Sequence, residues 1–313
     1  MIRRRLGLAH PAEVHSIVFH LLVLMAYGVA FWLYLHPQAA NLTGSLDRAA
    51  FIAGAGLLLG WCSGIDLGVN FHDHAHRRVF VRPWMNRTLA RTWGVAAGWP
   101  AYWWQYSHVV VHHRRLLTED DWTLPRRDAS GNYESFYRYT LLHYPWRYAA
   151  GMKREYRRAS PATRRRLIRE GLWFLALFSI PFWIDLQMAL WLWVLPAWFA
   201  NVFVVGPGMV AQHAGRKAPA PGNELAHSNT FTSKLFNLAF FNIGYHTEHH
   251  TWPHVHWSEL PELHIAVKRR LIDEGAHVVP FGYFRGGLLL SRAELGDDSA
   301  HAEFHAQHPE YVA

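Results

Sequence analysis

Long apolar runs alternate along this chain with shorter polar stretches that are rich in arginine. A helix needs about 20 mostly apolar residues to cross a bilayer, because the hydrocarbon core is about 30 Å thick and a helix rises about 1.5 Å per residue. Asp185 and Gln187 interrupt the longest run and indicate a tight turn between two helices. The pattern therefore predicts four spans, at 17–35, 51–70, 171–187 and 189–210.

Basic residues flank these spans on one predicted side of the membrane. The cytoplasmic loops of membrane proteins carry an excess of Lys and Arg. The two predicted turns on the other side carry only Arg48, whereas the basic groups gather at 3–5, 77–91, 153–170 and 216–217. We expect both termini to be cytoplasmic. A cleaved signal peptide is the alternative interpretation of the first run, which is long for a signal core.

The fold expected from this pattern is an all-α integral membrane protein with a helical cytoplasmic cap. The cap would comprise 71–170 and 211–290, and residues 1–313 would form a single membrane-embedded domain. The segment 93–107 is dense in Trp and Tyr, side chains that prefer the level of the lipid head groups. We expect this segment to lie along the membrane surface.

Composition narrows the possible functions. Of the 313 residues, 51% are hydrophobic and 17% are charged, against about a quarter charged in soluble domains. The single cysteine excludes a disulfide scaffold and an iron–sulfur cluster held by this chain. The formal charge is +8, but the basic residues follow the spans, so a nucleic-acid partner is excluded. The chain also has 23 histidines.

Ten of the histidines fall in four clusters that the predicted topology places on one side of the membrane. Two metal ions are the economical explanation, because one ion takes four to six ligands and imidazole suits Zn, Cu, Fe or Ni. His74 faces away from its neighbours in the first cluster and is left out. The candidate ligands are His72, His76, His108, His112, His113, His213, His246, His249 and His250.

The spacing within the clusters is that of ligands on helices. Residues four apart lie on one face of a helix, which fits His72/His76, His108/His112 and His246/His250. His249 is expected to share the face of His246. Adjacent histidines point about 100° apart, so each can serve a different metal.

Three functional classes are consistent with a histidine-rich site at a membrane. A zinc-dependent intramembrane hydrolase would use fewer histidines and a water-activating acid. A non-catalytic metal-binding or transport protein is the second class; a transporter would carry its ionisable groups near the bilayer midplane, whereas these histidines are predicted at one face. An enzyme that holds two metals is the third, and two metals account for all nine histidines.

The motifs HxxxH (72–76), HxxxHH (108–113) and HxxHH (246–250) resemble the three histidine boxes of the membrane fatty acid desaturase superfamily. The phrases TEDDWT after the second box and NIGYHTEHHTWPHVHWSELPELH around the third are also similar to that family. His213 matches its additional ligand. The resemblance implies that the nine histidines hold two irons per chain. The family usually has a small residue where this chain has His74.

The same resemblance implies the reaction and its partners. We expect an O₂-dependent fatty acyl desaturase that introduces a C=C bond into a lipid or acyl chain; a hydroxylase or ketolase of a hydrocarbon or carotenoid-type substrate is the alternative. Electrons would come from a separate ferredoxin or cytochrome b5-like protein. A ligating histidine usually donates its second N–H to a carboxylate or carbonyl, and Asp73, Asp121 and Glu248 are the candidate partners. Asp66 is a further candidate, because charges within spans are often functional.

Overall fold

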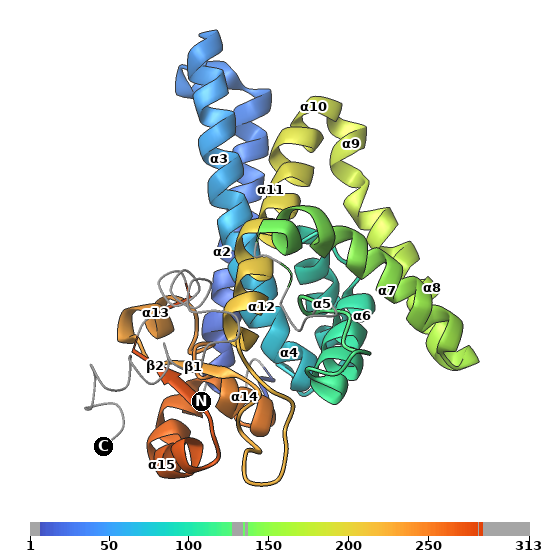
Figure 1. The fold of residues 1–313 in the computed structure, drawn as a ribbon. Helices are drawn as coiled ribbons and strands as arrows, with labels where there is room; N and C mark the ends of the chain where they lie inside the picture. Colours follow the sequence, from blue (N-terminus) through green and yellow to red (C-terminus); the bar gives the residue numbers. More distant parts are fainter. Residues whose placement is uncertain (1–6, 127–133, 135–136, 281, 284–313) are drawn as a thin grey trace. The chain divides into compact units, whose positions relative to one another are not determined.

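The computed structural model describes residues 7–126, 134, 137–280 and 282–283 of the chain. The end of the predicted cap, 284–290, lies outside these residues. The described part is mostly helical (Figure 1). The chain divides into two compact units: unit 1 comprises Met1–Tyr106 and Met152–Val205, and unit 2 comprises Ser107–Gly151 and Gly206–Ala313.

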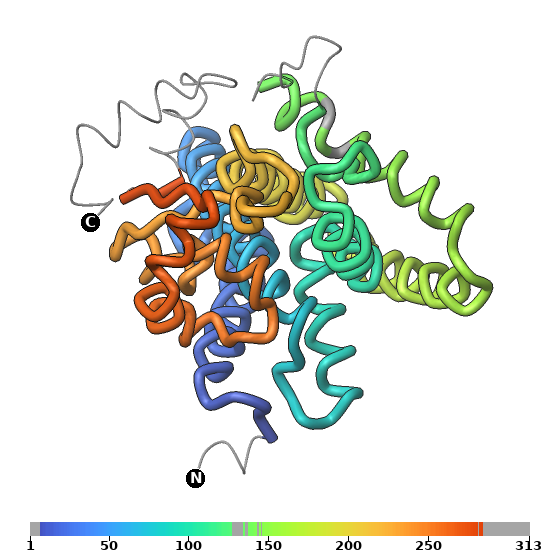
Figure 2. Tube along the Cα trace, turned by 60° about the horizontal axis from the view of Figure 1, so that its bottom comes forward, coloured from blue at the N-terminus to red at the C-terminus, as the bar shows by residue number. Residues whose placement is uncertain are grey.

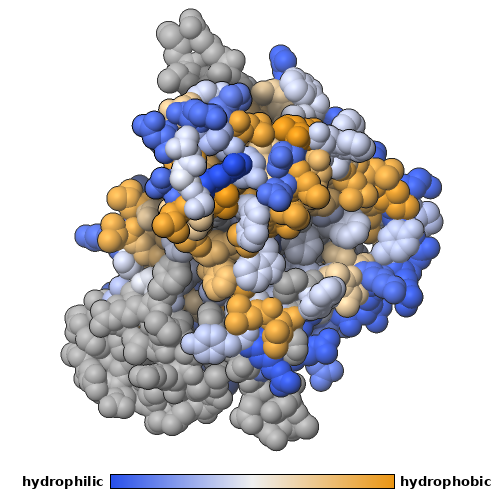
Figure 3. Space-filling view, turned by 90° about the horizontal axis from the view of Figure 1, so that it is seen from above, coloured by the Kyte–Doolittle hydropathy of each residue, from blue (hydrophilic) through white to orange (hydrophobic). Residues whose placement is uncertain are grey.

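Among the described residues, four helical stretches are long and apolar enough to cross a membrane, as predicted. They cover Glu13–Leu35, Ser45–His76, Pro161–Ile184 and Leu186–His213. Large apolar side chains on them point outward: Met25, Leu58 and Leu175 are 59%, 59% and 63% exposed. Figure 3 shows such apolar side chains on one face of the molecule. Outward-facing apolar side chains on helices of this length fit a lipid environment, and the chain is an integral membrane protein.

Unit 1 is built from helices. The π-helical turns within it, such as η2, continue the α-helices that precede them. Its elements are α2 (Glu13–Leu35), η1 (Pro37–Ala40), α3 (Ser45–Ile65), η2 (Asp66–Phe71), α4 (His72–His76), α5 (Pro83–Ala96), α6 (Ala101–Tyr106), α8 (Pro161–Phe178), α9 (Ile180–Ile184), α10 (Leu186–Ala189), η5 (Leu190–Val194), α11 (Leu195–Phe199) and η6 (Ala200–Val205). Helix α7 (Tyr144–Arg158) belongs to unit 2 up to Gly151 and to unit 1 beyond it.

All four spans begin or end outside the predicted limits, and the second and third differ most. The third begins at Pro161, ten residues before the predicted start at 171, because Ser160 caps the helix and Pro161 suits its first turn. The Ser160 hydroxyl accepts from the backbone N–H of Thr163 at 3.2 Å. The second span continues through η2 and α4 to His76, so the first histidine box lies on the end of the span itself.

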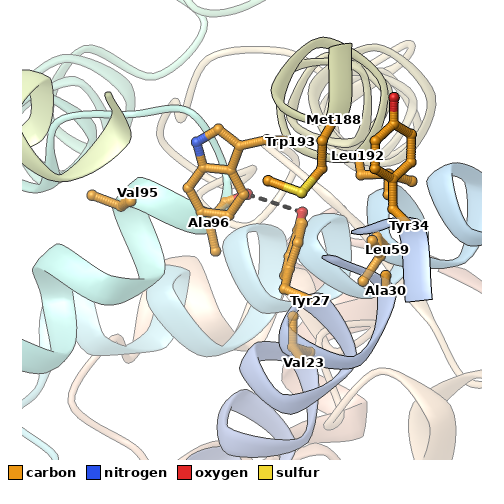
Figure 4. Packing of buried hydrophobic residues seen from close by; sticks show 10 residues of the cluster. All are labelled: Val23, Tyr27, Ala30, Tyr34, Leu59, Val95, Ala96, Met188, Leu192 and Trp193. Carbon is orange, nitrogen blue, oxygen red and sulfur yellow. Dashed lines mark hydrogen bonds between the residues drawn. The ribbon is translucent and has the colours of Figure 1, made fainter. Parts of the chain in front are cut away.

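The helices of unit 1 pack on an aromatic core. Tyr27 of α2 contacts Trp193 of η5 edge to face, with ring centroids 4.9 Å apart, and its hydroxyl lies 2.9 Å from the Ser63 hydroxyl of α3. Figure 4 shows these rings with the aliphatic side chains around them. The core therefore ties the first, second and fourth spans together.

A stripe of glycines on α3 lets a second helix approach closely. A Cβ added to Gly60 would lie 2.8 Å from the Phe199 side chain, and one added to Gly64 would lie 2.5 Å from Val204. Small residues four apart commonly mark close helix packing in membranes. The stripe joins α3 to α11 and η6.

Asp66 lies at the centre of a buried polar cluster in unit 1. Its carboxylate is 1% exposed and accepts hydrogen bonds from His20 Nδ1 at 2.6 Å, Asn70 Nδ2 at 2.9 Å and Trp93 Nε1 at 3.0 Å. None of these partners is a candidate metal ligand. Within 93–107, Trp93 and Trp104 are buried in the protein, so these two side chains do not reach the lipid head groups. The bond to Asp66 satisfies the Trp93 indole N–H inside the protein.

Unit 2 is helical, with one small sheet that the all-α expectation missed. Strands β1 (Asn229–Phe231) and β2 (His277–Val279) pair in parallel, Asn229 opposite His277. Three-residue strands are too short to show a period-two pattern in the sequence. Figure 2 shows 229–279, coloured orange to red, gathered in one region. The other elements are η3 (Ser107–His113), η4 (Arg138–His143), α12 (Gly206–His213), α13 (Lys234–Ala239), α14 (His246–Thr251), η7 (Trp257–Glu259) and α15 (Leu260–Asp273).

Candidate metal centre

Seven of the nine candidate ligands belong to unit 2, and they form two groups. The four-histidine group consists of His112 from η3, His213 from α12, and His246 and His250 from α14. One ligand nitrogen of each lies within 4.8 Å of the others. The three-histidine group consists of His108, His113 and His249, whose nitrogens meet the same limit. Residues distant in sequence are thus brought together around two positions.

The second box departs from the predicted pairing. We expected His108 and His112 to share a helix face, but His108 lies with His113, their Nε2 atoms 3.1 Å apart. The cause is the π-helical conformation of η3. A π-helix bonds residue i to i+5, so it brings residues five apart, rather than four apart, to the same side. His112 is then directed to the other group.

The third box is also divided between the groups. His246 and His250 are four apart on α14, and their Nε2 atoms lie 3.0 Å apart, as the spacing predicts. His249 was expected to join His246 but lies with His108 and His113. In each of the adjacent pairs His112–His113 and His249–His250, one histidine belongs to the four-histidine group and the other to the three-histidine group. Neighbouring residues on a helix point about 100° apart, which directs them to different groups.

Neighbouring polar groups determine which nitrogen of each ring faces its group. His112 Nδ1 lies 3.1 Å from Asp121 Oδ2, and an ionised carboxylate can only accept, so the proton is on Nδ1. His213 Nδ1 donates to the carbonyl of His227 at 3.0 Å in the same way. Both rings therefore present an unprotonated Nε2, the form that binds a metal.

The four-histidine group has the spacing and chemistry of a metal site. His246 Nε2 lies 3.2 Å from His213 Nε2 and 3.0 Å from His250 Nε2. Two nitrogens bound to one ion at about 2.1 Å, at angles of roughly 90–110°, lie about 3.0–3.4 Å apart. His112 Nε2 is buried and has no hydrogen-bond partner among the described residues. A cation fits this donor set and would satisfy that nitrogen.

Burial keeps imidazoles in this region neutral. Desolvation, reinforced by the nearby rings of His113 and His246, holds the pKa of His250 well below its ordinary value of 6.5. Desolvation lowers the pKa of His227 to about 4, with a smaller contribution from His112. A metal ligand must be deprotonated, so His250 is already in the binding form at neutral pH.

The remaining candidate ligands, His72 and His76, belong to unit 1. They are four apart on α4, with ring centroids 6.1 Å apart. His72 Nδ1 donates to the carbonyl of Gly68 at 3.0 Å, which leaves Nε2 as its ligand atom. His74 is turned toward α5, where its Nε2 lies 3.3 Å from the Asn86 carbonyl.

The three candidate carboxylates have different surroundings. Asp121 contacts the candidate ligand His112 and accepts a second bond from the Thr123 hydroxyl. Glu248 is fully buried and accepts from the Thr230 hydroxyl at 2.7 Å and from His264. Asp73 forms an ion pair with Arg77 at 2.7 Å.

Three residues outside the boxes support these groups, and of these Thr123 was not predicted. Thr123 lies 3.2 Å from His112 Nδ1 and also bonds Asp121. His227 supplies the carbonyl that holds His213, and His264 bonds Glu248 of the third box. The role of the His227 carbonyl could not be predicted, because a backbone carbonyl leaves no trace in a sequence, and Thr123 lies outside the spacing of the boxes.

Comparison with known proteins identifies the family of this chain. Residues 48–282, which include all nine candidate ligands, match the fatty acid desaturase family. The chain is also 26% identical over 237 residues to a beta-carotene ketolase of Paracoccus sp. (strain PC1), an alignment that covers 74% of this chain and 86% of the relative. With its four apolar spans and histidine clusters, the chain belongs to the fatty acid desaturase family, a family of membrane oxidoreductases.

Proposed function

We propose that this protein oxidises an unactivated C–H bond of a long apolar substrate at a pair of iron ions, with O₂ as co-substrate. The observation that carries the proposal is the four-histidine group, whose ligand nitrogens are spaced as ligands of one ion. When bound, paired iron supplies the oxidising power that such a bond requires. The chain's own residues hold the metals and fix the protonation of their ligands.

The proposed ligand set is that of the nine histidines. The first ion is held by His112, His213, His246 and His250. The second is held by His108, His113 and His249, and we propose that His72 and His76 of the first box complete its ligands, on the basis of the family's box pattern. Asp121 acts as a positioning residue, because its carboxylate keeps the proton of His112 on Nδ1.

The proposed oxidation can give either of two products. The family description favours desaturation of a fatty acyl chain, in which two hydrogens are removed and a C=C bond forms. The second candidate is oxygenation of a carotenoid-type substrate, which the ketolase relative favours because the alignment covers most of that protein. Formation of a ketone replaces two hydrogens of a methylene with one oxygen.

Either reaction needs electrons from a separate protein. We propose an acidic donor such as a ferredoxin or a cytochrome b5-like protein, which the basic residues next to the spans would attract. The active site would face the cytoplasm, where such donors occur.

The proposal is tested by expressing the chain in a bacterial host that makes carotenoids and profiling all lipids by mass spectrometry. Loss of two hydrogens from an acyl chain identifies a desaturase; exchange of two hydrogens for oxygen in a carotenoid identifies a ketolase. Purified protein should contain two irons per chain. Zinc at one per chain, with no oxidised product, would contradict the proposal.

The matched variants are His250→Ala and His254→Ala. His250 belongs to the four-histidine group, whereas His254 is exposed four residues later. We expect His250→Ala to abolish product and to lower the iron content while the protein still inserts into the membrane. His254→Ala should retain both. Product from His250→Ala at the wild-type level would contradict the ligand set.

A further inference from the structure

Unit 1 contains a cavity of about 250 Å³ that is lined mainly by basic and polar side chains. Its walls come from α4 and the two residues that follow it, and from α5, α6 and α8; they include Arg78, Arg87 and Arg166. We name this cavity the basic pocket. It lies at the polar ends of two candidate spans. These are the C-terminal end of Ser45–His76 and the N-terminal end of Pro161–Ile184. The ends of spans meet the lipid head groups.

The pocket has a net positive charge once its ion pairs are counted. Glu170 is its acidic residue, and Arg91 neutralises it through bonds of 2.8 and 3.0 Å. Arg77 is neutralised by Asp73 at 2.7 Å. Arg78, Arg87 and Arg166 form no ion pair within the described part of the chain. Three uncompensated guanidinium groups therefore face one small cavity.

The pocket also contains neutral groups that can bind a ligand. Gln105 lines it, and its amide can both donate to and accept from a hydroxyl. The guanidinium of Arg166 lies over the Tyr102 ring at 3.7 Å, which fixes its position. The pocket thus offers charge for an anion and an amide for a hydroxyl.

We propose that the basic pocket binds the head group of an anionic, hydroxyl-bearing phospholipid, such as one with a phosphoglycerol head. Guanidinium groups bind phosphate oxygens through paired, charge-assisted hydrogen bonds. A cavity of this size is smaller than the roughly 300–1,000 Å³ that encloses a whole drug-sized ligand, so it accommodates a head group and leaves the acyl chains in the bilayer.

The position of the pocket connects it to the candidate metal ligands. His76 of the first box is in its wall. A lipid bound here has its head group beside the first box. That this places the lipid next to a metal ligand rests on the proposed function. The binding site itself depends only on the charges of the pocket.

The test uses native mass spectrometry of the full-length protein, released from nanodiscs of phosphatidylcholine with or without phosphatidylglycerol. The variant Arg87→Gln/Arg166→Gln removes two pocket charges. Its control, Arg82→Gln/Arg165→Gln, removes two charges that do not line the pocket, one just before α5 and one on α8; all four arginines are exposed. We expect the wild type and the control to retain phosphatidylglycerol, and the pocket variant to bind it about tenfold more weakly or worse.

Equal weakening in both double variants would overturn the proposal, because the attraction would then be a general effect of surface charge. Glycerol phosphate added as a soluble competitor distinguishes a lipid site from a site for a free phosphate ester. Displacement of phosphatidylglycerol by an equal concentration of glycerol phosphate would contradict lipid binding. None of these measurements requires bound iron or enzyme activity, so the result is independent of the proposed oxidation.

Discussion

At the scale of single residues, the candidate centre depends on which nitrogen of each imidazole carries the proton. His112 shows this most clearly, because Asp121 and Thr123 both contact its Nδ1 while its Nε2 has no partner among the described residues. Asp121 is 6% exposed. A buried carboxylate next to a ligand orients the ring and raises its basicity.

We predict that Asp121→Asn weakens metal binding by about 10–100-fold, the usual effect of removing such a partner. The amide can place its NH₂ against Nδ1 and thereby favour the tautomer that carries the proton on Nε2. Iron retained during dialysis against a chelator, measured by elemental analysis, reports the change. Asp120→Asn is the control, because it removes the neighbouring exposed carboxylate. Wild-type iron retention in Asp121→Asn would show that Asp121 does not position His112.

At the scale of elements, hydropathy predicted the spans but not their internal geometry. The four spans could be predicted because each apolar run is long enough for a helix to cross a bilayer. The π-helical turns η2 and η3 were not predicted, because a π-turn depends on tertiary packing and leaves no periodic pattern. The clusters of histidines could therefore be found in the sequence, whereas the partners of His108 and His249 could not.

The glycine stripe of α3 gives a prediction at this scale. Gly64→Leu should reduce the stability of unit 1 by about 1–3 kcal/mol, because the side chain would overlap Val204 and push α3 away from η6. Thermal unfolding of the purified protein in detergent measures the effect. Gly54→Leu is the matched control, since Gly54 is exposed on the same helix with no atom within 4 Å of its added Cβ. If both variants unfold at the same temperature, close packing at Gly64 is not important for stability.

At the scale of the whole molecule, the side of the membrane that carries the histidines is a prediction from the sequence. The basic residues flanking the spans predict that 36–44 and the turn near 185 face outward and that 211–228 faces the cytoplasm. The structure describes 36–44 as a short connection between α2 and α3, and 214–228 as an irregular segment that follows α12. Both segments have exposed residues that a reagent can reach.

The single cysteine makes this orientation testable. Cys62 lies within a span and is replaced by Ser to give a cysteine-free background. A membrane-impermeant maleimide applied to intact cells should then label Ala40→Cys, which is exposed between the first two spans, but not Ala218→Cys, which is exposed after the fourth. Permeabilised cells should label both, which controls for accessibility. The reverse pattern in intact cells would place His213, five residues before Ala218, on the outer side, away from the cytoplasmic electron donors that the proposed oxidation requires.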